Sequence, residues 1–299
     1  MRIRETQLEP PERGCVFCDL VVGAMGEVWL IDDRRRLWKF ARDGTLLGKV
    51  DNLVRPPGSH LPIMENWRSG LVVADADTST ISLLENGQPV RGVSTQHPPT
   101  KTVCRADGTI FYACTEADVL LHCVAPNGDE SEIPGDGRST SGCPVMNPAG
   151  DLYHVDFRAG VVRAIEPSQR VHLVADCGYG KYPARGQDIY FVEDGSKPPM
   201  VDVERRWCVD GTWVDPLGLA ILHGVETTMS PLISLVDVKS NKVSSVAIGV
   251  RDRFWAMAAS TASDVCLLEW PSGGRAQRIL EIDLMELSIE RSRRSALDS

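Results

Sequence analysis

A repeating hairpin pattern dominates the arrangement of hydrophobic and polar residues along the chain. Its clearest copy covers residues 146–165. A turn with proline and glycine precedes the apolar run 152–157, a short polar turn follows, and the apolar run 161–165 returns. Short runs of β-branched and aromatic residues separated by a tight turn are typical of two antiparallel strands. The segment therefore predicts one β-hairpin.

The same pattern recurs along the chain, with almost no helical periodicity between the copies. A single unit of this size cannot bury both of its faces, so such units stack radially and close into a ring. The sequence predicts an all-β fold, a β-propeller of seven blades, each a four-stranded antiparallel sheet. The fifth and sixth units are the weakest copies, and six blades is the alternative. The units centre on residues 26–40, 70–84, 107–124, 146–165, 187–203, 218–238 and 253–270.

The two ends of the chain differ in composition from the repeats. Residues 1–13 contain two adjacent prolines and alternating charges, which predicts an extended N-terminal arm. Residues 286–299 are a polar C-terminal tail that forms at most a short helix. We therefore expect the propeller to span residues 14–285. A length of 299 residues agrees with this, because all-β folds of that size are often a single unit.

Charge and hydropathy narrow the classes of partner. The formal net charge is −9, whereas a nucleic-acid surface needs clustered lysine and arginine to displace counterions. We interpret the basic clusters at 34–36, 205–206 and 291–294 as solvated surface. No apolar run approaches the roughly 18 residues of a membrane helix, and the first residues are charged where a signal peptide would be apolar. We expect no nucleic-acid partner, no membrane and no export.

Nine cysteines, an odd number, favour a reducing compartment. Most of them lie in or beside apolar runs, as small buried side chains do. Cys15 and Cys18 have the spacing of a metal or redox pair, but no second pair, histidine pair or following helix pattern completes such a site. We favour a structural role for both. The prediction is a cytoplasmic protein with free thiols.

The repeat can also be compared with the blades of known propellers. Residues 107–112 (Asp-Gly-Thr-Ile-Phe-Tyr) and 150–156 (Gly-Asp-Leu-Tyr-His-Val-Asp) resemble the blades of NHL-repeat and gluconolactonase (SMP-30)-like propellers. The resemblance covers most of the chain, is carried by the blade motif alone and implies a scaffold. The Glu-Gly-Pro that supplies a metal-binding carboxylate in gluconolactonase-like enzymes has no counterpart; the nearest sequence places Glu27 inside a strand pattern. This departure argues against lactonase chemistry.

A recurring proline marks the loops that we expect on one face of the ring. It occurs in 56–62, 94–99, 139–144 and 178–183, where the outer strand of one blade would lead to the inner strand of the next. Proline alone is turn chemistry. Polar and aromatic side chains just before it on successive blades make these loops a candidate rim for a ligand. The predicted ligand-binding residues are His60, His97, Cys143, Tyr179, Lys181 and Tyr182.

Carboxylates recur where the first strand of each hairpin ends, at Asp32, Asp75, Asp156 and Glu193. A ring of carboxylates can hold a divalent cation, because hard cations need several converging oxygens. An aspartate at a strand end also accepts hydrogen bonds from its own turn, and repetition in successive blades is typical of a structural role, which we favour. Four histidines in apolar runs are interpreted as packed and hydrogen-bonded, namely His122, His154, His172 and His223.

Two functions from different classes follow. The first is a non-catalytic propeller that holds a peptide or small metabolite on the rim, as an accessory protein of a biosynthetic pathway and without a cofactor. The second is a metal-dependent lyase or lactone hydrolase, in which His60 and His97 with Glu116 or Glu226 bind one divalent metal ion or move a proton. We favour binding, because the signature carboxylate is missing. Lys181 can then meet a ligand carboxylate.

Overall fold

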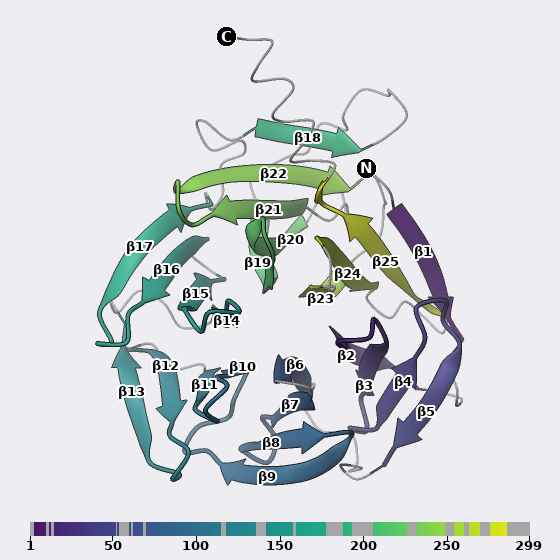
Figure 1. The fold of residues 1–299 in the computed structure, drawn as a ribbon, viewed down its shortest axis with the longest axis horizontal. Coiled ribbons are helices and arrows are strands. Elements are labelled where there is room, and N and C mark those ends of the chain that lie inside the picture. The colour runs from purple at the N-terminus through teal and green to yellow at the C-terminus, as the bar shows by residue number, and fades with distance from the viewer. Residues whose placement is uncertain are drawn as a thin grey trace.

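The computed structural model shows a closed ring of β-sheets around a central axis (Figure 1). Every regular element in the described part of the chain is a strand, and none of the described segments is a helix long and apolar enough to cross a membrane. The structure describes residues 3–9, 12, 15–51, 53, 60, 62–67, 70–114, 118–135, 142–157, 160–177, 188–192, 206–225, 232–248, 254–259, 263–269 and 276–285.

Six sheets, which we call blades 1 to 6, form the ring, each built around four antiparallel strands that follow one another from the axis outwards. Blade 1 contains β2 (Phe17–Val22), β3 (Val28–Asp32), β4 (Leu37–Phe40) and β5 (Leu46–Val50). Blade 2 contains β6 (Ile63–Trp67), β7 (Gly70–Asp75), β8 (Thr80–Glu85) and β9 (Gln88–Ser94). Blade 3 contains β10 (Lys101–Cys104), β11 (Ile110–Ala113), β12 (Val119–Val124) and β13 (Glu130–Pro134).

The second half of the ring follows the same plan. Blade 4 contains β14 (Gly142–Met146), β15 (Leu152–Asp156), β16 (Val161–Ile165) and β17 (Val171–Asp176). Blade 5 contains β19 (Arg206–Val214), β20 (Gly218–Val225), β21 (Leu232–Asp237) and β22 (Lys242–Ile248). Blade 6 contains β23 (Phe254–Ala259), β24 (Asp264–Glu269), β25 (Gln277–Asp283) and, as its outer strand, β1 (Ile3–Leu8).

The prediction of seven blades was wrong, because the ring has six. The error lies in the fifth predicted unit. Its first run is β18 (Asp188–Val192), which opens no blade; it pairs in parallel with β22 at the outer edge of blade 5. The second run of that unit, 200–203, lies outside the described residues. Composition predicted a strand here, but it could not identify a partner that comes much later in the chain.

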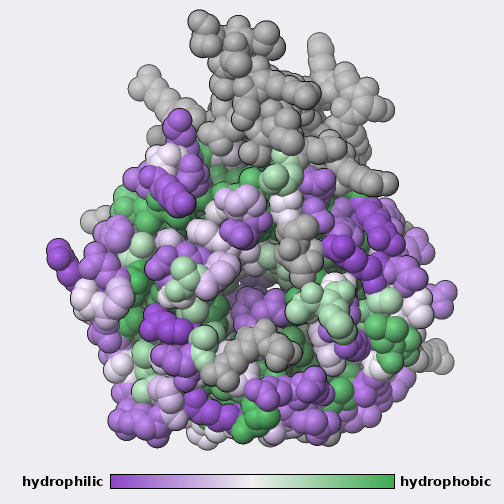
Figure 2. Space-filling view, viewed as in Figure 1, coloured by the Kyte–Doolittle hydropathy of each residue, from purple (hydrophilic) through white to green (hydrophobic). Residues whose placement is uncertain are grey.

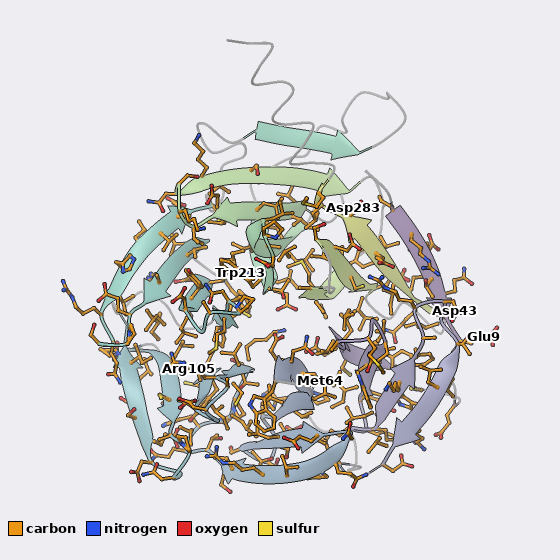
Figure 3. All side chains as sticks on the ribbon, viewed as in Figure 1. Glu9, Asp43, Met64, Arg105, Trp213 and Asp283 are labelled. Carbon is orange, nitrogen blue, oxygen red and sulfur yellow. The ribbon has the colours of Figure 1, made fainter. Side chains whose placement is uncertain are left out.

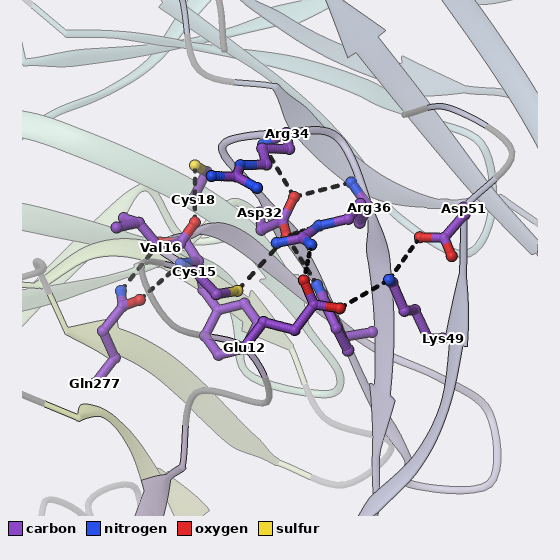
Figure 4. A network of polar contacts seen from close by, with 12 residues as sticks. Glu12, Cys15, Val16, Cys18, Asp32, Arg34, Arg36, Lys49, Asp51 and Gln277 are labelled. Carbon is purple, nitrogen blue, oxygen red and sulfur yellow. Dashed lines mark hydrogen bonds and ion pairs between the residues drawn. The ribbon is translucent and has the colours of Figure 1, made fainter. Parts of the chain in front are cut away.

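The N-terminal segment closes the ring. Residues 3–8, expected as part of an extended arm, form β1 and pair with β25 from Ile3↔Ile282 to Leu8↔Gln277. The side chain of Gln277 adds a second link between the last blade and the first. It accepts a hydrogen bond from the Phe17 amide (2.6 Å) and donates one to the Phe17 carbonyl (3.0 Å), as a neighbouring strand would (Figure 4). The two ends of the propeller are therefore joined both by main chain and by side chain.

The hydrophobic core lies between neighbouring blades. Alternate residues of an inner strand face opposite neighbours. On β2, for example, Leu20 packs against blade 6, and Val21 packs against blade 2. An inner strand is therefore buried on both faces and reads as a nearly continuous apolar run. A charged residue within such a strand is exceptional and needs a partner.

The two faces of the ring carry different connections. We call the face where the inner strands begin the start face, and the face where they end the end face. The connection between β9 and β10, which holds His97 of the predicted rim, lies on the start face. The turns that join each inner strand to the second strand lie on the end face. In blade 4 this turn is closed by Gly150, whose φ of 89° is unfavourable for other residues and whose amide donates to the Asn147 carbonyl at 2.9 Å.

The cysteines whose side chains are described are free thiols, which confirms that prediction for the described part of the chain. Cys15 and Cys18 are both buried and unbonded to each other. The Cys15 thiol donates to the Asp32 carboxylate at 3.5 Å, and burial together with that carboxylate raises the pKa of Cys15 to about 12 (Figure 4). A thiol that stays protonated at neutral pH is a poor nucleophile, which supports a structural role.

Candidate functional site on the propeller axis

Three charged side chains meet on the axis of the ring. Lys101, the first residue of β10, extends its ammonium to within 2.9 Å of Asp210 Oδ1 on β19, and it lies 4.0 Å from Asp19 Oδ2 on β2. Both aspartates are buried. The three residues come from alternate blades 1, 3 and 5, so this axial triad connects blades that are not neighbours in the ring.

Irregularities in the inner strands place the two aspartates. The register of β2 against β3 shifts between Phe17 and Asp19, and that of β19 against β20 shifts between Cys208 and Asp210. Such β-bulges turn the following side chain in a new direction. Each aspartate then accepts a hydrogen bond from the inner strand of the next blade, Asp19 from the Met64 amide (2.9 Å) and Asp210 from the Met257 amide (3.0 Å).

Glu65 on β6 and Cys143 on β14 complete the polar lining. With them, five of the six inner strands contribute a titratable side chain to the axis, and Met257 of β23 contributes its amide. The Cys143 thiol lies 3.7 Å from Asp210 Oδ1. The Glu65 carboxylate accepts a hydrogen bond from the Asn66 amide at 3.0 Å.

The protonation of this cluster follows from burial and mutual repulsion. Burial raises the pKa of Asp19 to about 6; Lys101 opposes this rise and Asp210 adds to it. Burial also raises the pKa of Glu65 to about 7, with a further contribution from Asp210. For Lys101, burial favours the neutral amine, but Asp210 and Asp19 outweigh it and raise its pKa, so the ammonium stays charged. Glu65 therefore exchanges a proton near neutral pH, and Asp19 does so about one pH unit lower.

A cavity of about 770 Å³ opens at the end face beside this cluster. Figure 2, viewed down the axis, shows the surface hollowed at the centre of the ring, and Figure 3 shows Trp213 of β19 near this hollow. The lining comes from the last residues of five inner strands and the turn after β14. Its members include Glu65, Arg105, Val145, Met146, Asn147 and Trp213.

Trp213 gives the cavity an aromatic wall with a polar edge. Its ring stacks on Tyr153, with centroids 5.5 Å apart and planes at 18°. Its indole nitrogen is buried and has no hydrogen-bond partner within the described part of the chain. The cavity therefore has an aromatic wall from Trp213, whose N–H is enclosed, and a hydrogen-bond acceptor from Glu65.

The described residues of the predicted rim lie toward the start face, on the other side of the ring from this cavity. His60 pairs with Asp77 (Nδ1 to Oδ1, 2.9 Å), and His97 stacks on His122 with ring centroids 4.8 Å apart. Cys143 is buried at the axis. Three further predicted residues lie outside the described part of the chain, namely Tyr179, Lys181 and Tyr182. The ligand-binding role of this rim stays a prediction.

The described carboxylates at strand ends make hydrogen bonds that agree with the structural role that we favoured. Asp32 accepts hydrogen bonds from the amides of Arg34 and Arg36 in its own turn, both at 2.9 Å (Figure 4). Asp75 accepts two hydrogen bonds from the guanidinium of Arg35, at 2.6 and 2.9 Å, which link blade 1 to blade 2. Glu193, Glu116 and Glu226 lie outside the described residues.

Two expectations about individual residues were wrong. Arg35 and Arg36 are 3 % and 5 % exposed, so this basic cluster is not solvated surface apart from Arg34. Each buried arginine is neutralised by an aspartate, a pairing that the local sequence does not reveal. His172 is exposed beside Glu166, whereas the other three histidines are buried as expected.

Sequence reasoning missed the axial site because it assigned the second and third strands of each blade and left most inner strands unassigned. A usable signal was present. Asp19, Glu65, Lys101 and Asp210 are charged residues within or at the start of short apolar segments, where charge is rare. Their convergence on one point depends on ring closure, which a local pattern does not contain.

Comparison with known proteins supports the fold. No protein-family model matches the chain, and no curated protein matches it in sequence. A catalytically inactive virginiamycin B lyase from Staphylococcus aureus with quinupristin has a TM-score of 0.62 at 10 % identity and covers 94 % of this chain and 100 % of that one. A luciferin-regenerating enzyme has a TM-score of 0.58 at 9 % identity, with 94 % and 95 % covered.

A third solved structure is a protein bound to a peptide. YCF48 bound to D1 peptide has a TM-score of 0.54 at 10 % identity and covers 92 % of this chain and 79 % of that one. Identities this low show the fold alone. The chain is thus a β-propeller similar in architecture to these proteins, and the resemblance to NHL-repeat and SMP-30-like propellers stands at the level of the fold.

Proposed function

We propose that the protein binds a small organic molecule or a short peptide segment in the cavity at the end face. The observation that supports this most is the cavity itself, because the ends of five inner strands line it and its wall includes Glu65 of the axial cluster. Ligand sites in proteins are concave, mostly preformed and combine apolar walls with a few convergent polar groups. A perturbed titratable group within a cavity adds to that case.

The chemistry of the lining suggests the class of ligand. Met146, Val145 and Pro148 offer apolar surface, and Trp213 offers a flat aromatic face. Glu65 accepts a hydrogen bond, and as a carboxylate it favours a cationic donor. The ligand would therefore carry an amine or similar donor next to an apolar or aromatic part, as amino acids, short peptides and their derivatives do. The net charge of −9 attracts a cationic ligand at long range.

Proteins of the same architecture support this choice indirectly. One similar propeller was solved with quinupristin and another with a peptide, so the architecture accommodates compact organic and peptide ligands. The cavity lies on the end face, whereas the rim predicted from the sequence lies on the start face. The class of ligand is the one that the sequence suggested.

A ligand screen with matched variants tests the proposal. Wild-type protein would be screened by thermal shift against amino acids, amino-acid amides, short peptides and biogenic amines, and hits measured by calorimetry. Glu65→Gln should weaken an amine ligand about 10- to 100-fold, because a charged hydrogen bond is worth about 1.5–3 kcal/mol. Trp213→Phe should weaken it as well. Glu85→Gln and Trp29→Phe are the controls, since neither residue lines the cavity. If Glu65→Gln and Trp213→Phe bind every hit as the controls do, the cavity is not the site.

Catalysis by proton transfer is a second candidate, and the pKa of Glu65 favours it. A general base works best with a pKa near the working pH, and burial places Glu65 at about 7. Two of the similar propellers are a lyase and a luciferin-regenerating enzyme. Each ligand found above would be incubated with protein and followed by mass spectrometry. Turnover that Glu65→Gln abolishes supports catalysis, and an unchanged ligand supports binding alone.

A further inference from the structure

A second cluster of side chains lies on blade 3, away from the axial cavity. Tyr112, His122 and Glu132 occupy directly opposed positions on β11, β12 and β13. The rings of Tyr112 and His122 stack with centroids 4.8 Å apart and planes at 13°. The His122 ring also stacks with the His97 ring, with centroids 4.8 Å apart and planes at 28°. Two imidazoles thus meet beside a carboxylate.

The loop between β9 and β10 holds His97 in this place. The Thr95 amide donates to the Ser79 carbonyl at 2.8 Å, and the Thr95 hydroxyl donates to the His97 carbonyl at 2.8 Å. The Gln96 amide donates to Glu130 Oε2 at 3.2 Å, which fixes the loop to β13. His97 therefore comes from a different blade connection than His122 and Glu132, and the loop itself positions it.

We propose that His97, His122 and Glu132 bind a zinc-type divalent ion. One ligand atom from each residue lies within 4.8 Å of the other two, and this is the group of that kind among the described residues. Zn–N and Zn–O bonds of about 2.0–2.1 Å place tetrahedral ligands roughly 3.3 Å apart, so the three atoms need to close by about 1.5 Å at most. His97 is half-buried and Glu132 is exposed, so both can move toward the buried His122. The His97 ring must also turn out of its stack on His122, because an imidazole binds a metal through the in-plane lone pair of its nitrogen.

The donor set selects the class of ion. Mg²⁺ and Ca²⁺ prefer oxygen ligands, whereas two imidazoles and one carboxylate form a known type of zinc site with an open fourth position. The Cys114 sulfur lies 3.2 Å from His122 Nε2, so a soft donor adjoins the site. Glu130 Oε1 lies 3.6 Å from His122 Nδ1 and also accepts the Tyr112 hydroxyl hydrogen bond. A carboxylate beside a ligating histidine orients the ring and strengthens it as a ligand.

Such an ion would link the loop between β9 and β10 to β12 and β13 of blade 3. A ligand that binds only the folded state raises the stability of the protein, so the ion would stabilise the fold. The proposal is independent of the axial cavity, which shares none of the three residues.

Metal titration of purified full-length protein tests the site. Protein prepared without chelator, then stripped and dialysed, would be titrated with Zn²⁺ by calorimetry, and with Co²⁺ followed by its visible absorption. The expected result is one ion per chain with micromolar or tighter affinity, a rise in unfolding temperature and no comparable response to Mg²⁺. His97→Ala and Glu132→Gln should each weaken Zn²⁺ about 10-fold or more.

The control is His172→Ala. His172 Nδ1 lies 3.7 Å from Glu166 Oε1, so it forms an exposed His–Glu pair without a second histidine in the described surroundings. The His172→Ala variant should bind Zn²⁺ as tightly as wild type does. Unfolding curves recorded without metal identify any variant that is misfolded. His97 and Glu132 are chosen for substitution because neither side chain is fully buried. Wild type that fails to bind one equivalent of Zn²⁺ overturns the proposal, and so do His97→Ala and Glu132→Gln variants that bind like the control.

Discussion

At the scale of single residues, Glu65 makes stability depend on pH. Its pKa rises from 4.5 to about 7 on folding, mainly through burial. Between these pH values Glu65 is protonated in the folded protein and ionised in the unfolded chain. The contribution of Glu65 to the free energy of unfolding therefore falls as pH rises from about 4.5 to about 7, and it is constant above pH 7. Glu65→Gln removes this titration. The stability of Glu65→Gln relative to wild type should therefore increase across this window, on the order of 2–3 kcal/mol.

Urea unfolding of both proteins at a series of pH values from 4 to 8 measures this difference. The comparison cancels other carboxyls, including Asp19, whose pKa burial also raises. If the free energies of unfolding of wild type and Glu65→Gln differ by the same amount at every pH from 4 to 8, Glu65 does not exchange its proton in this window.

At the scale of strands, Lys101 connects β10 with β2 and β19 through the axial triad. Lys101→Met leaves Asp19 and Asp210 buried without a cation. Breaking a buried charge network in this way costs about 3–5 kcal/mol, and we expect that loss at pH 8. The loss should shrink toward pH 5, because Asp19, whose pKa burial raises to about 6, is then protonated and no longer needs a cation. Chemical unfolding at both pH values measures it.

Lys39→Met is the matched control for Lys101→Met. Lys39 pairs with Glu27 at 3.2 Å near the surface, where an ion pair is worth about 1 kcal/mol or less. Adding Asp210→Asn to Lys101→Met should recover part of the lost stability. Equal losses in the two lysine variants would argue that the triad has no special role.

At the scale of the whole molecule, ring closure depends on β1. Deleting residues 1–9 removes every cross-strand pair of β1 with β25 and the side chain of Leu8, which is 1 % exposed. Removing a buried leucine alone costs about 2–5 kcal/mol, and the exposed edge of β25 can pair with other chains. We expect a lower unfolding temperature and concentration-dependent association. Calorimetry and light scattering measure both.

A peptide of residues 1–12 added to the truncated protein should raise its unfolding temperature, and a scrambled peptide should not. If the truncated protein unfolds at the same temperature as the full chain, closure by β1 contributes little.

The hairpins of the blades could be predicted from the sequence. Residues 152–156 and 161–165 form β15 and β16, where the apolar runs and the turn between them placed two strands. This succeeds because strand composition and tight turns are local properties. Blade number was not predictable in the same way, since β18 has strand composition and a partner distant in sequence.

Local pattern by itself determined the all-β class, the propeller repeat and the buried thiols, because each depends on neighbouring residues or on composition. The tertiary structure alone decided the six-blade closure by β1, the neutralisation of Arg35 by Asp75, and the meeting of Asp19, Lys101 and Asp210 on the axis. These contacts join residues that are far apart in the chain. Their energy comes from burial and from charges within a few ångströms, and such distances exist only once the ring has closed.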